Sequence, residues 1–142
     1  MASSEADFQS ELIKEFKAAS KGFAIKISDK FFSGVVDLNV AYQGTTAWIE
    51  LKYSVRPKLS ATPLHLKLTK NQREFIKSYH EADCFAGWAL CVKNPDRTWS
   101  LYAGTNPDQE SATELDLVHV RRYGGKWDVK ALMNFITRRL PA

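Results

Sequence analysis

Apolar residues recur every three or four positions in three segments of the chain, which is the spacing of one helix face. These segments are residues 6–19, 69–82 and 129–140. The second begins with Thr69-x-x-Gln72, a pattern in which two side chains cap the backbone N–H groups of a helix start. We therefore expect three helices. The apolar residues that carry the spacing are Phe8, Leu12, Ile13 and Phe16 in the first, Phe75, Ile76 and Tyr79 in the second, and Leu132, Met133, Ile136 and Leu140 in the third.

Alternating apolar and polar residues predict strands between the first two helices. Residues 23–27 form the first candidate, and residues 34–42 and 45–53 form two longer ones. Gln43 and Gly44 separate the longer pair, and two residues of this type favour a tight β-hairpin turn. We therefore expect the longer pair to form an antiparallel hairpin.

The rest of the chain adds further strands and connections. Residues 84–92 and 98–102 are candidates for a second hairpin, and residues 117–120 for a short strand. Residues 28–30 indicate a polar turn. Residues 54–67 contain two prolines and several cations, which predicts an exposed loop. Together these elements predict an α/β domain with a mixed sheet, mainly antiparallel at its centre and flanked by helices.

The composition is that of an ordinary globular chain. With 142 residues it can bury one sizeable core, so we expect a single domain over residues 1–142. A formal net charge of +4 suits an anionic partner such as DNA. No segment approaches the roughly 18 apolar residues of a membrane span. We expect a soluble, cytoplasmic protein without a membrane partner, of a size that suits a chain encoded by a phage or mobile element.

The two cysteines give a weaker indication of a cytoplasmic protein. Cys84 and Cys91 lie along one expected strand, where a disulfide between them is geometrically awkward. We expect both to be buried apolar side chains, which agrees with a reducing compartment.

The first hairpin carries charged residues that its register brings together. If Tyr42 faces Thr45 across the turn, Asp37 lies opposite Glu50 on the same face of the strands. Lys52 follows two positions along that face. Two facing carboxylates repel each other unless a cation lies between them, and Mg²⁺ prefers oxygen ligands. A metal site is therefore one interpretation, and an ion cluster on an exposed strand face is the other.

Two aromatic stretches also have a structural and a functional interpretation. Trp48 projects from the same strand face as Glu50, and we expect it to pack under the first helix rather than to stack on a base. Residues 121–127, RRYGGKW, mix cations and aromatics as a nucleic-acid surface does. We favour a packing corner for this segment.

The acidic hairpin resembles the core motif of the PD-(D/E)XK nuclease superfamily. The resemblance is carried by V-D at 36–37, the hairpin and E-L-K at 50–52. Residues 68–76, LTKNQREFI, then open a helix, and this order is similar to the VRR-NUC and archaeal Holliday-junction-resolvase branches. The resemblance covers residues 11–92. Valine replaces the usual proline before the first acid, and the insert at residues 53–67 is long.

This resemblance implies a restriction-endonuclease-like fold and a divalent cofactor, Mg²⁺ or Mn²⁺. Asp37 and Glu50 would bind the metal, together with the backbone carbonyl of Leu51. Glu11 matches the carboxylate of the family's first helix, which reaches the metal directly or through water. Glu15, one helical turn further on, is the competing choice.

The resemblance also implies an activity. Lys52 would assist the attacking water, and Gln72 matches a glutamine that related nucleases place near the site, although it also fits the helix-capping pattern. We expect a Mg²⁺-dependent DNA endonuclease of recombination and repair that cuts branched DNA such as Holliday junctions, as a possible homodimer. The alternatives are a monomeric nuclease for flaps, single strands or nicks, and a nucleic-acid-binding module without catalysis.

Cationic residues gather in the sequence beside the proposed site. Such residues can neutralise phosphates and make DNA binding depend on salt. The alternative is a solvated loop and helix start. The residues are Arg56, Lys58, Lys67, Lys70 and Arg73.

Overall fold

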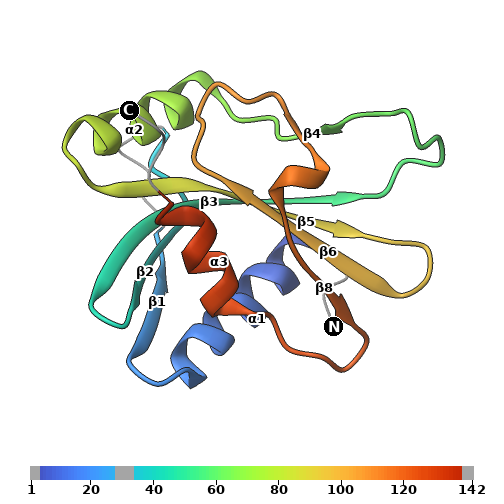
Figure 1. Cartoon of the computed structure of the whole chain (residues 1–142), viewed down its shortest axis with the longest axis horizontal. Coiled ribbons are helices and arrows are strands. Elements are labelled where there is room, and N and C mark those ends of the chain that lie inside the picture. Colours follow the sequence, from blue (N-terminus) through green and yellow to red (C-terminus); the bar gives the residue numbers. More distant parts are fainter. Residues whose placement is uncertain (1–3, 28–33, 139–142) are drawn as a thin grey trace.

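The structure is a computed structural model that describes residues 4–27 and 34–138. Its helices are α1 (Glu5–Ala18), α2 (Lys70–Glu81) and α3 (Val129–Ile136), with a short 3-10 helix, η1 (Glu114–Asp116). Its strands are β1 (Gly22–Lys26), β2 (Leu38–Tyr42), β3 (Thr45–Val55), β4 (Leu64–His65), β5 (Phe85–Lys93), β6 (Thr98–Gly104), β7 (Ser111–Ala112) and β8 (Leu117–Arg122) (Figure 1). The expected turn at residues 28–30 and the expected apolar position Leu140 lie outside the described residues.

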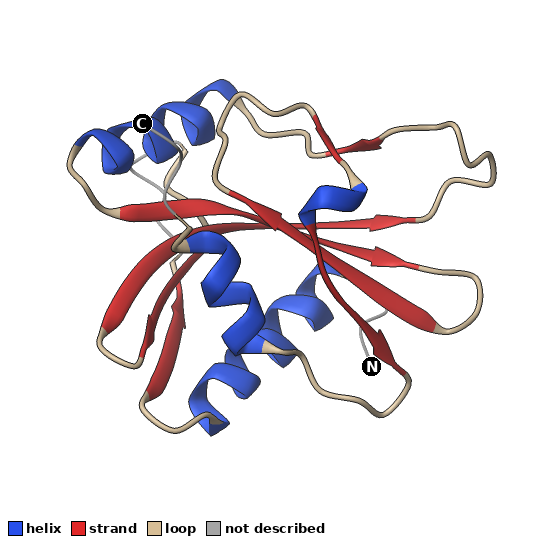
Figure 2. Ribbon diagram, viewed as in Figure 1, coloured by secondary structure: helices blue, strands red, loops and turns tan. Residues whose placement is uncertain are grey.

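Six strands form one mixed sheet in the order β1-β2-β3-β5-β6-β8 (Figure 2). β3 and β5 run parallel, and the other neighbouring strands of this sheet run antiparallel. A parallel pair needs a long crossover connection, and the segment that contains α2 provides it. The expected mixed sheet flanked by helices is confirmed, but its central pair, β3 and β5, is parallel, which corrects the expected antiparallel centre.

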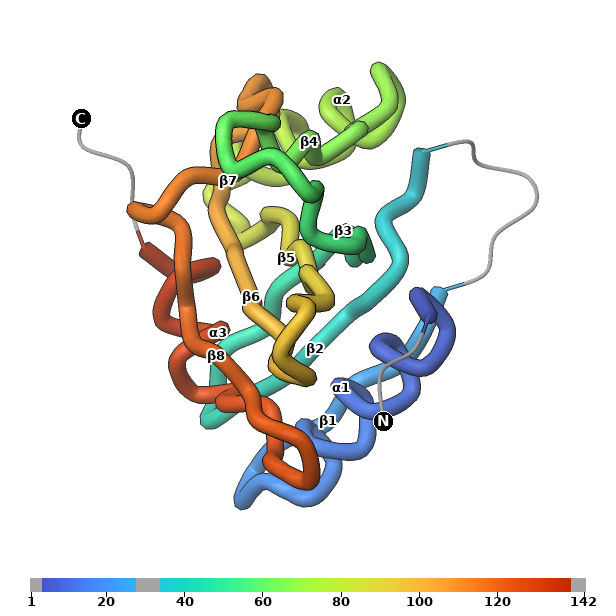
Figure 3. Tube along the Cα trace, turned by 90° about the vertical axis from the view of Figure 1, so that its right-hand side faces the viewer, coloured from blue at the N-terminus to red at the C-terminus, as the bar shows by residue number. Residues whose placement is uncertain are grey.

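Different helices cover the two faces of the sheet. α1 and α3 lie on one side and α2 lies on the other (Figure 1, Figure 3). Phe8, Leu12 and Phe16 of α1 are fully buried in one cluster with Ile49 and Leu51 of β3. The apolar stripe that predicted α1 therefore holds it on the sheet, at about 1.5–3 kcal/mol for each buried side chain. Within the described residues, no helix is both long and apolar enough to cross a membrane.

The segment before α2 lies on the sheet, which corrects the exposed loop expected at residues 54–67. Leu64, Leu66 and Leu68 are at most 9% exposed and cluster with side chains of β5. They alternate with polar residues as in a strand, and β4 pairs here with β7. β3 also extends past its expected end, so residues 56–63 form the connection.

The C-terminal corner is built around a buried cation. Arg121 is 4% exposed, and its guanidinium carbon lies 4.5 Å from the ring centre of Trp127 and 5.3 Å from that of Trp99. A carboxylate oxygen of Glu11 lies 3.1 Å from Arg121 Nη1. Because a buried cation needs such partners, the corner ties α1 to β8. The packing interpretation is confirmed for Arg121 and Trp127.

The two cysteines differ in exposure. Cys91 is buried in β5, as expected. Cys84 is exposed, which corrects the expectation, because it stands in the turn before β5 rather than inside the strand.

Candidate metal centre

The turn that sets the hairpin register is formed as expected. Gln43 and Gly44 both have positive φ, of 50° and 84°, as a two-residue hairpin turn of this kind requires. Tyr42 then pairs with Thr45, and the ladder continues in the expected register to the start of β2. This register directs the residue before β2 toward the middle of β3.

Asp37 lies just beyond the last ladder pair, Leu38 with Ile49. Its Oδ2 accepts a hydrogen bond from the N–H of Leu51 at 3.2 Å, and its own N–H donates to Glu50 Oε1 at 3.3 Å. β3 continues past the end of β2, so the side chain of Asp37 takes up a backbone N–H that a strand partner would otherwise bind. The two acidic residues are thus held side by side.

Glu50 is a buried acid, with 3% of its surface exposed. It stands beside Trp88 of β5, on the face that α2 covers. The pKa of Glu50 is raised to about 8, first by burial and then by the nearby Asp37 carboxylate, and Lys52 partly opposes both effects. Close to neutral pH the group keeps a proton unless a cation joins it. The interpretation as an exposed ion cluster is therefore wrong for Glu50.

Lys52 and Gln72 complete a continuous polar group with the two acids. Lys52 Nζ lies 3.4 Å from Glu50 Oε2 and donates to Gln72 Oε1 at 3.2 Å. Gln72 Nε2 donates to Glu50 Oε2 at 3.1 Å. We call the four residues Asp37, Glu50, Lys52 and Gln72 the hairpin site.

Gln72 also caps its own helix. Thr69 N–H donates to Gln72 Oε1 at 3.0 Å, and Gln72 N–H donates to Thr69 Oγ1 at 3.1 Å. The predicted capping box is confirmed. From the sequence, a role in helix capping and a role in the site were alternatives for Gln72. In the structure the same side-chain amide has both roles. Thr69 had no part in the predicted site, although its capping box with Gln72, itself a candidate site residue, was a usable signal.

Glu11 is not brought to the hairpin site. It pairs with Arg121 instead, because α1 covers the face of β3 that carries Leu51, whereas Glu50 points to the opposite face. Glu15, the competing choice, belongs to the same helix. Among the described residues, neither helix carboxylate joins Asp37 and Glu50 in a group of three that could hold a metal ion.

The ligands that remain suit a magnesium-type ion. Among the described residues, no group of three or more His, Cys, Asp or Glu side chains is arranged to hold a metal ion. Asp37 and Glu50 therefore offer two carboxylates. Mg²⁺ is commonly bound by one or two carboxylates and several waters, whereas zinc sites usually need three or four protein ligands, chiefly His and Cys. A cation between these acids would also offset the repulsion that raises the pKa of Glu50.

The two arginines expected to bind nucleic acid contact the protein itself. Arg56 Nε donates to Asn94 Oδ1 at 3.0 Å, and Arg56 Nη2 donates to Tyr102 Oη at 2.9 Å. Arg73 Nε donates to the carbonyl of Leu68 at 3.2 Å. Both guanidinium groups therefore fasten segments of the fold.

The three expected lysines remain accessible. Lys58, Lys67 and Lys70 are exposed, and Lys70 is the first residue of α2. Lys70 and Gln72 both lie in the first turn of α2. The positive charge of Lys70 is therefore two residues in sequence from a member of the hairpin site. These lysines are available to an anionic partner.

Trp48 packs on α2, which corrects its expected position under the first helix. Its ring centre lies 5.5 Å from those of Phe75 and Tyr79. Ile76 is fully buried beside them. The apolar positions that predicted α2 therefore do bind it to the sheet, on the same face as Glu50.

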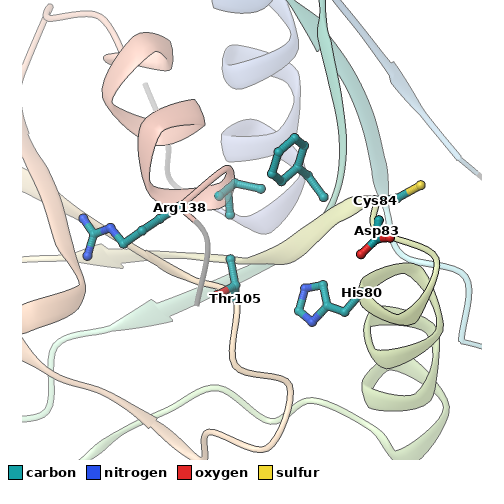
Figure 4. Close-up of a pocket in the computed structure, with 7 residues that line it drawn as sticks. His80, Asp83, Cys84, Thr105 and Arg138 are labelled. Atoms are coloured by element: carbon teal, nitrogen blue, oxygen red, sulfur yellow. The ribbon is translucent and has the colours of Figure 1, made fainter. Parts of the chain in front are cut away.

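A pocket among the described residues lies at a different place. It has a volume of about 520 Å³ and is lined by residues that include His80, Asp83, Thr105 and Arg138 (Figure 4). His80 follows Gln72 by eight positions in α2, which is about 12 Å along the helix axis. The hairpin site does not line this pocket.

Comparisons with known proteins find a distant likeness to solved structures. No protein-family model and no curated protein matches the sequence. Among solved structures, the chain is similar to Hjc, a Holliday junction resolvase from the archaeal hyperthermophile Archaeoglobus fulgidus. The match has 19% sequence identity and a TM-score of 0.49, and covers 92% of this chain and 97% of that one.

Proposed function

We propose that this protein is a metal-dependent nuclease that hydrolyses phosphodiester bonds in DNA, with the hairpin site as its catalytic centre. The observation that carries the proposal is the buried Glu50 carboxyl, held beside Asp37 with Lys52 Nζ 3.4 Å away. Burying the Glu50 carboxyl beside a second acid costs free energy that an apolar side chain at this position would not. A site that binds a cation and a phosphate accounts for that cost.

Asp37 and Glu50 would hold the metal ion. Leu51 donates its N–H to Asp37, and the N–H and C=O of one strand residue point to the same side. The carbonyl of Leu51 is therefore directed toward the same edge as the Asp37 carboxylate. When bound, Mg²⁺ supplies positive charge against the phosphate and makes a coordinated water more acidic.

Lys52 would act on the reacting phosphate. Its ammonium is held by Glu50 and Gln72, which fixes the direction of its remaining donors. A fixed cation stabilises the charge that develops on phosphate oxygens during in-line attack by water on phosphorus. Lys52 is also placed to orient that water.

For the substrate we propose branched DNA, cut by a homodimer. This part of the proposal rests on the sequence resemblance to resolvase branches and not on a feature of the site. A dimer is expected because two symmetric cuts need two sites. A monomeric flap, single-strand or nicking nuclease and a binding module without catalysis are the competing outcomes.

Cleavage of end-labelled junction, flap, duplex and single-stranded DNA tests the proposal. Wild type is compared with Asp37→Asn and Lys52→Met, in Mg²⁺, Mn²⁺ or EDTA. Lys130→Met is the matched control, because Lys130 is an exposed lysine of α3 on the opposite face of the sheet.

We expect cutting that requires metal, disappears in both site variants and persists in the control. The preferred substrate, with the mass of the protein in solution, decides between a dimeric resolvase and a monomeric nuclease. DNA binding without cleavage of any substrate would contradict the nuclease and favour the binding module.

A further inference from the structure

The first turn of α2 contacts the hairpin site through one amide group. Gln72 Oε1 accepts hydrogen bonds from Lys52 Nζ at 3.2 Å and from Thr69 N–H at 3.0 Å. Gln72 Nε2 donates to Glu50 Oε2 at 3.1 Å. An amide turned by half a rotation would set its NH₂ against two donors, the Lys52 ammonium and the Thr69 N–H, so these donors fix its orientation.

Thr69 holds the turn that carries this amide. Its Oγ1 accepts the N–H of Gln72 at 3.1 Å, and its own N–H donates to the amide oxygen. Gln72 is therefore fastened at both its backbone and the end of its side chain, which removes its freedom to choose another rotamer. Thr69 thus acts on Lys52 and Glu50 through Gln72.

The same turn also contacts the segment that leads to Asp37. Gly34 has a φ of 90°, and a Cβ added there would lie 2.3 Å from Asn71 Cβ. Glycine is therefore needed for the backbone to pack this closely on α2. Two residues further on, Val36 is fully buried in a cluster with Ile76 of α2.

We propose that the first turn of α2 is the element that positions the two sides of the hairpin site, with Thr69 and Gly34 as its positioning residues. This inference rests on the proposed nuclease function. Gly34 places the segment that leads to Asp37, and Thr69 places Lys52 and Glu50 through Gln72. In the proposed reaction both acids must face the same cation, and the lysine must face the phosphate. A shift of this turn therefore slows the chemical step more than it weakens DNA binding.

Thr69→Ala is the direct test, with Thr69→Ser as the conservative rescue. We expect Thr69→Ala to lower kcat about 10-fold to 100-fold with little change in KM, and Thr69→Ser to restore kcat. Ser4→Ala is the matched control. The Ser4 hydroxyl oxygen caps α1 in the same way, by accepting the N–H of Asp7 at 3.2 Å. Ser4→Ala therefore removes a helix cap without altering α2.

A second measurement reads the position of Gln72 without any cleavage. The side-chain NH₂ protons of Gln72 are expected to exchange slowly with solvent by NMR in wild type, Thr69→Ser and Ser4→Ala, and rapidly in Thr69→Ala. This comparison decides the inference even if wild type cuts no DNA, so its failure is distinguishable from failure of the proposed function.

Gly34→Ala tests the other half of the inference and leaves the Thr69 cap intact. Its Cβ forces the segment away from Asn71, so we expect a loss of kcat while the Gln72 amide stays protected. Slow exchange of that amide in Thr69→Ala, an equal loss of kcat in Ser4→Ala, or an unchanged kcat in Gly34→Ala would each overturn the proposed positioning role.

Discussion

A carboxyl group that is 3% exposed has lost most of its hydration, and Glu50 recovers only part of it from its neighbours. Gln72 and the N–H of Asp37 donate to its two oxygens, and Lys52 lies 3.4 Å away. These contacts do not offset burial and the Asp37 charge, because the pKa of Glu50 is still raised from 4.5 to about 8. Between these pH values the folded protein holds a proton that the unfolded chain releases.

The stability of the metal-free protein should therefore fall with rising pH. A raised pKa contributes stability that is present below the unfolded value, here 4.5, and is lost as the pH passes through the folded value of about 8. We expect the free energy of unfolding to fall by on the order of 2–4 kcal/mol across this window. Urea denaturation at a series of pH values from 5 to about 8 measures the fall.

The Glu50→Gln variant and added Mg²⁺ test whether Glu50 causes this dependence of stability on pH. The amide cannot ionise, so the Glu50→Gln variant should lose most of the fall in stability. Mg²⁺ should restore stability at the upper end of the window, since a cation favours the ionised acid. An equal pH dependence in wild type and Glu50→Gln would show that another group is responsible.

At the scale of elements, the sequence was informative where the determining residues are close together. Gln43 and Gly44 alone set the register that brings Asp37 to Glu50. The pairing of Glu11 with Arg121 joins residues 110 positions apart, and no local pattern indicates such a partner. One of the three carboxylates predicted for the metal site, that of Glu11, therefore belongs to the packing of a distant corner instead.

The strand at Leu64 was missed for a related reason. It has two residues, follows two prolines, and pairs with β7, which is also only two residues long. The alternation of Leu64, Leu66 and Leu68 was visible in the sequence, but a segment this short gives no period that distinguishes it from a loop.

Leucines of this segment allow a paired test of whether it is part of the core. Leu66 is 1% exposed, so Leu66→Ala should lower the free energy of unfolding by about 2–5 kcal/mol. Leu59, in the neighbouring connection, is 73% exposed, and Leu59→Ala should change it by less than about 0.5 kcal/mol. Urea unfolding of both variants makes the comparison, and similar small effects would mean that residues 64–68 behave as an exposed loop.

At the scale of the whole molecule, the fold separates structural from accessible cations. Arg121 lies buried between aromatic rings, and Arg56 bonds to Asn94 and Tyr102. Lys58 and Lys70 are exposed on segments flanking the strand that leads into α2. The modest net charge of +4 therefore says less about DNA binding than the location of the exposed lysines.

Salt dependence of DNA binding distinguishes these two kinds of cation. A lysine that contacts a phosphate contributes about 0.9 to the slope of log affinity against log salt, so Lys58→Gln and Lys70→Gln should each reduce the slope by nearly that amount and leave stability unchanged. Fluorescence anisotropy in EDTA, which removes the metal that the proposed cleavage needs, measures the slope.

The control for this prediction is Lys130→Gln, which removes the same charge from α3 on the opposite face of the sheet. If DNA lies along the hairpin site, this variant keeps the wild-type slope. If all three variants lower the slope equally, binding follows net charge alone, and the exposed lysines near α2 do not define a DNA path. Arg56→Ala should differ from all of them, because losing its bonds to Asn94 and Tyr102 lowers the free energy of unfolding by about 1–3 kcal/mol.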